Sequence, residues 1–337
     1  MAIEKKKPAN RKYYMDALRI VCILFVIFNH TGKNGYVLFI DRQQSPFYWI
    51  YLFISLFIKT AVPIFYMISG ALLIPKEESL ATLYKKRILK YFLVLIFFSI
   101  LSYFYSLGFD FRAFSLKDFF TTLYTNRHAT AYWYLYSYLG YLMVLPFIRK
   151  LANNLDNKMH IYMLVLFLFN QSLTVLDWLF FKGDKSRNSW FVLFVAERTL
   201  FYPLMGYFLD SKLPKNKYKY TCVLLVCFSI VTLLISAILT TERANYLNAW
   251  TESEIQKFAW TYVCFPSMAL FLFFKIIFEK TQRSYRLLYE VSSCTFEIML
   301  IENICRKETF SLFAIFNRFL PKYLACWSWV LVSFLFF

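Results

Sequence analysis

Long apolar runs separated by short polar loops dominate the hydrophobic pattern of the 337-residue chain. Most of them approach the roughly 20 residues that a helix needs to cross a bilayer. The runs span residues 17 to 38, 48 to 74, 91 to 109, 131 to 148, 160 to 181, 189 to 209, 219 to 240, 258 to 278, 291 to 313 and 323 to 337. The pattern therefore predicts an all-α polytopic membrane protein, with about ten transmembrane helices in a single bundle.

The composition supports the same class of protein. Hydrophobic residues make up 59% of the chain, aromatic residues make up 22%, and the mean hydropathy of +0.48 is far above that of a soluble domain. The net charge is +18, but the basic residues lie in short loops between the runs, where they orient a membrane protein. We therefore expect the lipid bilayer, and no nucleic acid, as a partner.

Cysteine and histidine spacing argues against a metal site. The seven cysteines contain no CxxC pair and fall mostly inside apolar runs, so they are typical of small buried side chains. The three histidines, His30, His128 and His160, lie far apart in the predicted topology. We expect no metal and no disulfide framework.

Basic residues also predict the orientation of the chain. With a cytoplasmic N-terminus, the inner segments hold 21 lysines and arginines and the outer segments hold 14, which favours two cytoplasmic termini. Residues 1–15 then form a basic cytoplasmic segment before a retained first span. The eight tryptophans fall at or near the predicted outer ends, as in an interfacial aromatic belt; alternatively, some of them stack on a sugar in an outward-facing cleft.

Three ionisable residues, Asp16, Arg19 and His30, share one face of the first predicted helix. At 100° per residue, the eleven steps from Arg19 to His30 close to within about 20° of whole turns, and Asp16 lies within about 40° of that face. The rise from Arg19 to His30 is roughly 16 Å, about half the hydrocarbon thickness. Such groups must face protein or water rather than lipid. One interpretation is that this face takes part in the function of the protein. The other is that Asp16 and Arg19 form an interfacial pair and that a backbone carbonyl accepts a hydrogen bond from the imidazole.

The second apolar run contains two features that shape helix packing. Pro63 removes a backbone donor inside the run and predicts a kink, which is more often structural than catalytic. Ser69 and Gly70 are small and permit a neighbouring helix to approach closely.

A basic cluster follows this run, at the predicted cytoplasmic mouth of the third span. Arg87 and Lys90 share a helical face there, and Lys86 lies beside them. The cluster is typical of the positive-inside signal, but guanidinium and ammonium groups are also the usual partners of phosphates. Both interpretations remain open from the residues alone.

The order of these motifs resembles the acyltransferase 3 family of integral-membrane O-acyltransferases. The similar elements are Arg19-x10-His30 after Asp16, then VPIFYMISG, then a basic Rxx(R/K) at the inner end of the third run. The resemblance covers essentially the whole chain and implies one transmembrane domain, residues 1–337.

Two later stretches resemble family motifs as well. AYWYL, which contains Trp133 and Tyr134, is similar to HLWFL, and SSCTFEIMLIEN is similar to S-x-x-TFGIYLIH. Three positions differ from the family pattern: Ala131 and Glu302 stand where many members have histidine, and Lys90 replaces the second arginine.

The resemblance implies a membrane-bound O-acyltransferase. We expect transfer of acetyl from cytoplasmic acetyl-CoA, a co-substrate, to a hydroxyl of a cell-envelope polysaccharide or its lipid-linked precursor, in a multi-pass protein of the bacterial plasma membrane. An alternative is a transporter or exporter of polysaccharide or a small molecule on the same fold, because an intramembrane ionisable face suits a pathway equally well. A sensor or scaffold would need no such face.

The residues suggest how the reaction would proceed. We expect His30 to act as the catalytic base or to carry the acyl group transiently, with Glu302 orienting its imidazole. A neutral imidazole is required, so activity should fall at acidic pH. Arg19 would orient the donor and Asp16 would restrain Arg19.

The remaining predicted site residues divide between the donor and the substrate wall. We expect Arg87, Lys90 and also Lys86 to contact the phosphates of the acyl-CoA donor. We expect Ser69, Trp133 and Tyr134 to line the substrate or to support its site.

Overall fold

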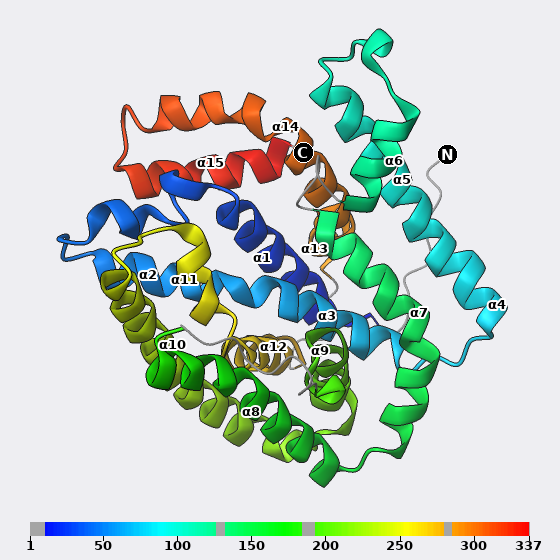
Figure 1. Cartoon of the computed structure of the whole chain (residues 1–337). Coiled ribbons are helices and arrows are strands. Elements are labelled where there is room, and N and C mark those ends of the chain that lie inside the picture. Colours follow the sequence, from blue (N-terminus) through cyan, green and yellow to red (C-terminus); the bar gives the residue numbers. More distant parts are fainter. Residues whose placement is uncertain (1–10, 126–131, 184–192, 280–284, 337) are drawn as a thin grey trace.

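The computed structural model describes residues 11–125, 132–183, 193–279 and 285–336, and these are helical, with turns and short 3-10 segments and no strand. The helices wrap around a central group made of α1, α3, α9 and α12 (Figure 1). Their bounds are α1 Tyr13–Asn29, α2 Tyr48–Phe57, α3 Ala61–Leu73, α4 Leu80–Leu83, α5 Leu89–Ser106, α6 Leu116–Thr125, α7 Trp133–Asn154, α8 Asn157–Phe181, α9 Arg198–Tyr207, α10 Tyr218–Tyr246, α11 Glu252–Ala259, α12 Cys264–Glu279, α13 Arg286–Ser293, α14 Thr295–Phe316 and α15 Lys322–Phe336.

The all-helical prediction is confirmed for the described residues, and the apolar helices make this a membrane protein. Four helical stretches are both long and apolar enough to cross a bilayer: Tyr48–Leu73, Leu80–Ser106, Asn157–Phe181 and Lys215–Tyr246. The shorter apolar helix Lys322–Phe336 comes in addition. Each of the ten predicted runs overlaps at least one of the helices above, but ten crossings and two cytoplasmic termini stay predictions. His128, Trp190 and Ala131 lie outside the described residues.

The first predicted run is longer than the helix it contains. Helix α1 ends at Asn29, and the chain then turns through short 3-10 segments, with Gly32 in the left-handed region at φ +52°. The apolar residues after this turn do not continue the helix toward lipid. Tyr36 and Phe39 are fully buried against α1, α2 and α15 instead. A run of apolar residues is compatible with either outcome, which is why the pattern placed the helix end too late.

The second run breaks where the sequence contains Pro63. Because proline has no N–H, the carbonyl of Lys59 loses its usual helical partner, and residues Ile58–Thr60 form a 3-10 turn between α2 and α3. The break leaves Lys59 inside the protein, with only 5% of the residue exposed. The predicted kink therefore positions a charged side chain.

Helix α3 crosses α9 at very short range, as the small residues predicted. A Cβ atom on Gly70 would lie 2.0 Å from the backbone oxygen of Pro203, so only glycine fits at this crossing. The contact fixes α3 against the centre of the bundle. Residues of α3 line both cavities described below.

Polar contacts gather several helix ends on one face of the bundle. Lys12, just before α1, contacts the Asp210 carboxylate after α9 at 2.5 Å, and Lys275 near the end of α12 donates to the Asp210 carbonyl at 2.6 Å. On the same face, Arg149 of α7 donates to the carbonyl of Leu73 at the end of α3, at 3.0 Å. His30 lies at the opposite end of α1. We refer to these two sides as the inner and the outer face.

Candidate active site

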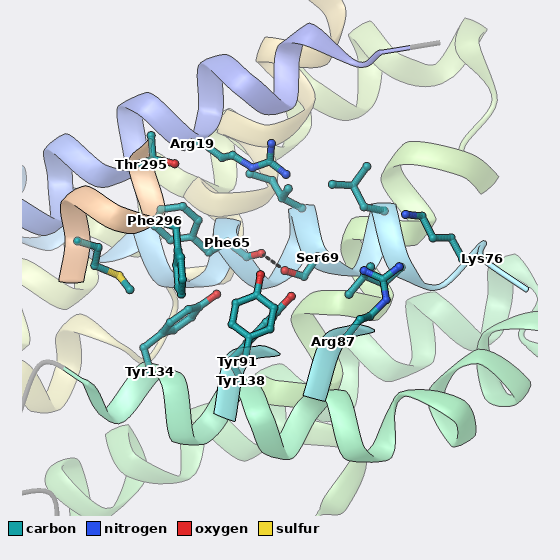
Figure 2. Close-up of a pocket in the computed structure, with 14 residues that line it drawn as sticks. Arg19, Phe65, Ser69, Lys76, Arg87, Tyr91, Tyr134, Tyr138, Thr295 and Phe296 are labelled. Carbon is teal, nitrogen blue, oxygen red and sulfur yellow. Dashed lines mark hydrogen bonds between the residues drawn. The ribbon is translucent and has the colours of Figure 1, made fainter. Parts of the chain in front are cut away.

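An inner cavity of about 280 Å³ lies between α1, α3, α5, α7 and α14. Figure 2 shows Arg19 and Arg87 entering it from different elements, with the rings of Tyr91, Tyr134 and Tyr138 on one side. It is lined by Arg19, Phe65, Ile68, Ser69, Leu72, Leu73, Lys76, Arg87, Tyr91, Tyr134, Tyr138, Thr295, Phe296 and Met299.

Asp16 fixes Arg19 at the wall of the inner cavity. The Asp16 carboxylate, 2% exposed, accepts from Arg19 Nη1 at 3.0 Å and from Arg11 Nε and Nη2 at 2.7 and 2.8 Å. The Ser292 hydroxyl, near the end of α13, donates to it as well, at 2.9 Å. One carboxylate is thus shared by two arginines, so the cluster keeps a net positive charge. Asp16 and Arg19 are therefore in contact, and the role of this contact in orienting the donor stays a prediction.

Glu78 fixes Arg87 in the same way. Its carboxylate accepts from Arg87 Nε and Nη2 at 2.7 and 3.0 Å and from Arg149 Nη2 at 3.0 Å. The hydrogen bonds from Arg87 lower the pKa of the Glu78 carboxyl from 4.5 to about 2. Two arginines again share one acid, so this side of the cavity is also positive.

The predicted basic cluster divides in the structure. Arg87 lines the inner cavity, whereas Lys86 and Lys90 are exposed and line neither of the two cavities. Lys76 takes part in the wall instead. Helical spacing alone did not indicate it, because Lys76 precedes the helix and reaches the cavity from the loop after α3.

Ser69 and three tyrosines form the middle of the inner cavity. The Ser69 hydroxyl donates to the Phe65 carbonyl one turn earlier at 2.9 Å, the contact that is dashed in Figure 2. The Tyr134 and Tyr138 rings stack with centroids 5.8 Å apart, and Tyr91 meets Tyr138 edge to face at 5.0 Å. Polar hydroxyls and flat rings therefore line the route between the arginines and α14.

A larger outer cavity of about 460 Å³ adjoins the first. It is lined by Phe25, Val26, Asn29, His30, Ile58, Lys59, Ala61, Val62, Phe65, Trp133, Tyr134, Arg198, Trp260, Met299, Asn303 and Arg306. Phe65, Tyr134 and Met299 belong to the walls of both cavities. Arg19 lines the inner cavity and His30 lines the outer one, so the two residues predicted to share one face of α1 lie at adjoining cavities.

His30 and Glu302 form a dyad at the outer cavity. His30 Nδ1 lies 2.9 Å from Glu302 Oε2, across 272 residues of sequence. A carboxylate can only accept, so Nδ1 carries the proton and, in the neutral ring, Nε2 keeps its lone pair. The imidazole is therefore held in the tautomer that a general base needs.

Arg306 completes this group. It donates to Glu302 Oε1 from Nε at 2.7 Å and to Oε2 from Nη2 at 3.1 Å. The Glu302 side chain is only 4% exposed, so this bidentate contact and His30 compensate a charge that would otherwise be costly to bury. Our reading of the sequence missed Arg306; its i,i+4 spacing from Glu302 is the signal that could have indicated it.

The outer cavity contains two further cations, Lys59 and Arg198, that the sequence motifs did not indicate. Lys59 lies in the 3-10 turn between α2 and α3, and Arg198 is the first residue of α9. No ion pair joins Glu197 to Arg198 in the described part of the chain, although both line a side cavity of about 200 Å³ next to the outer one. The signal for Lys59 was a lysine inside an apolar run, four residues before a proline.

The arrangement combines a positive inner cavity with an adjoining cavity that holds a histidine–carboxylate dyad, which suits the transfer of a group from an anionic donor to a nucleophile. The model of the acyltransferase 3 family, described as an acyltransferase domain, matches residues 12–337. The chain belongs to the acyltransferase 3 family. The resemblance seen in the motifs is thereby confirmed, and this acyltransferase 3 protein is a membrane acyltransferase. A comparison with curated proteins and with solved structures finds no match.

Proposed function

We propose that the protein is an O-acetyltransferase of the plasma membrane. In this proposal it takes acetyl from cytoplasmic acetyl-CoA and delivers it to a hydroxyl of a cell-envelope polysaccharide or a lipid-linked precursor. The observation that carries the proposal is the junction of the two cavities, where the cations of the inner cavity and the dyad of the outer cavity share Phe65, Tyr134 and Met299 as common walls.

The inner cavity would hold the donor. Arg19, Lys76 and Arg87 offer positive charge to the phosphates of acetyl-CoA, and the two arginines are preoriented by the carboxylates of Asp16 and Glu78. The rise along α1 from Arg19 to His30 is roughly 16 Å, a span that an extended pantetheine arm can cover. Lys86 and Lys90, which line neither cavity, would contribute only a long-range attraction.

The outer cavity would hold the acceptor, with His30 as the general base. The Nε2 lone pair removes the proton from the acceptor hydroxyl while the oxygen attacks the thioester carbonyl. The C–S bond then breaks, and the leaving thiolate of coenzyme A takes up a proton. Glu302 acts as a positioning residue, because it holds the ring through Nδ1 and stabilises the imidazolium that forms. In a variant of this scheme, His30 carries the acetyl group transiently.

Transfer of labelled acetyl from acetyl-CoA by the purified protein tests the proposal. We expect transfer by the wild type and a loss of at least about a hundredfold in His30→Ala, the usual value of general-base help. Expression and detergent stability of the variant must match the wild type. Turnover of His30→Ala close to the wild type would refute the base. Substrate movement without any transfer would favour the transporter.

A further inference from the structure

The outer cavity contains two cations that no described acid neutralises by an ion pair. Lys59 Nζ donates to Asn29 Oδ1 at 2.7 Å and lies 4.4 Å from the centroid of the Tyr36 ring. The Arg198 guanidinium carbon lies 5.1 Å from the centroid of the Trp260 ring. Lys59 is nearly fully buried, yet a single amide oxygen satisfies only one of its three donors. Both residues line the cavity that His30 faces.

The other charges near the outer cavity leave it positive. Arg306 is matched by Glu302, which also holds His30. Glu252 attracts Lys59 electrostatically, but it does not line the cavity. Glu197 lines only the side cavity. Positive groups in a membrane-embedded site are costly unless an anion or water meets them, so the cavity is suited to a negatively charged ligand.

Aromatic side chains and size indicate what kind of anion fits. Trp133, Tyr134 and Trp260 line the same space as the two cations, and flat rings with polar edges suit the faces of a sugar. The volume of about 460 Å³ lies within the range of small-molecule sites. A charged sugar unit would therefore meet rings, cations and the His30 base together.

We propose that the acceptor is an acidic glycan. Its carboxylate or phosphate group lies between Lys59 and Arg198, and this contact presents a nearby hydroxyl to His30. The inference rests on the proposed function, because it names the substrate class for the same site. Lys59 and Arg198 then determine acceptor specificity and have no part in the chemical step.

Three probes test the inference: methyl glucuronide with a carboxylate, glucose 1-phosphate with a phosphate, and neutral methyl glucoside. Binding of each probe to the purified full chain is measured first, without acetyl-CoA, and acetyl transfer to each is measured second. The variants are Lys59→Met, Arg198→Gln and Lys59→Arg, which keeps the charge. Lys117→Met and Arg318→Gln change the same residue types at exposed positions that line neither cavity.

We expect at least one charged probe to bind and react about tenfold or more better than the glucoside, the effect of one charge-assisted contact. Lys59→Met and Arg198→Gln should remove this preference by raising KM for the charged probe, and Lys59→Arg should restore part of it. The preferred probe distinguishes a carboxylate from a phosphate. Because Arg198 is exposed, Arg198→Gln should fold even if Lys59→Met does not.

Two results would overturn the inference: equal use of neutral and charged probes, or an equal loss for all probes in both variants, which would assign the cations to the reaction itself. Failure of the proposed function gives a different result. A protein that binds the charged probes through Lys59 and Arg198 but transfers no acetyl supports the acidic ligand and refutes the transferase.

Discussion

Replacing Glu302 by glutamine separates the charge of the dyad from its shape. In the native protein the carboxylate accepts from His30 Nδ1 at 2.9 Å on one oxygen and from Arg306 on both. Glutamine keeps the size but replaces one acceptor oxygen with an NH2 donor. That donor must face either Arg306 or His30, and both of these partners also donate. The variant therefore loses at least one hydrogen bond and the charge that would stabilise an imidazolium.

The general energy of a hydrogen bond to a charged group gives the size of the expected effect. A hydrogen bond to a charged group contributes about 1.5 to 3 kcal/mol. If the contact between His30 and Glu302 strengthens as the ring takes up a proton, this energy appears in the barrier, and kcat falls about 10- to 150-fold in Glu302→Gln. The inner cavity does not contain Glu302, so KM for acetyl-CoA should change little.

Steady-state acetyl transfer by the purified protein, at saturating acetyl-CoA, measures kcat directly. Glu290→Gln is the matched control, because Glu290 forms only an exposed pair with Arg286 and such pairs contribute about 0 to 1 kcal/mol. If His30 and Glu302 act as one unit, the double variant His30→Ala with Glu302→Gln should be no slower than His30→Ala alone. A folded Glu302→Gln protein with the kcat of the wild type would refute the positioning role.

Three further predictions concern donor binding and stability. Arg87→Ala should weaken the apparent affinity for acetyl-CoA about tenfold or more, and Lys86→Ala should change this affinity little. Equal effects of the two substitutions would mean that both residues serve only as a positive-inside signal. Gly70→Ala places a Cβ 2.0 Å from the α9 backbone and should lower the thermal midpoint, by an overpacking cost of about 1 to 3 kcal/mol, whereas Gly140→Ala meets nothing within 4 Å and should not. Glu78 has a lowered pKa of about 2, so its stabilisation is complete above its ordinary pKa of 4.5 and is lost as pH falls toward 2. Thermal unfolding in detergent should show that Glu78→Gln lowers the midpoint at pH 6 and makes a progressively smaller difference below pH 4.5; a pH-independent difference would contradict this origin.

The sequence was informative wherever one helix determines the answer. Helical periodicity placed Arg19 and His30 on one face of α1, and the structure places them at two cavities that share three lining residues, Phe65, Tyr134 and Met299. Spacing i,i+3 predicted the contact of Asp16 with Arg19. The small residue Gly70 predicted a close crossing, which α9 supplies. These features depend on local geometry, which the order of residues determines directly.

The sequence was less informative where the answer depends on packing between distant elements. The end of α1 at Asn29 could not be read from the apolar pattern, because residues after the turn are equally apolar but are buried in protein rather than in lipid. Lys76, in the loop after α3, enters the inner cavity, and Lys90, at the start of α5, does not. Only the three-dimensional path of the chain distinguishes them.

Glu302 stands where many family members have histidine, and this difference gives His30 a more constant hydrogen-bond acceptor. A histidine at this position would accept from His30 Nδ1 only in one tautomer and only while unprotonated. A carboxylate accepts without that condition, and its negative charge stabilises the imidazolium that forms when His30 removes a proton. The carboxylate also requires a compensating cation in this buried position, and Arg306 supplies one from the same helix, one turn later, at 2.7 Å. The replacement and Arg306 therefore form one unit: Arg306→Ala should leave the buried Glu302 carboxylate with His30 as its remaining partner and should lower the thermal midpoint of the protein in detergent.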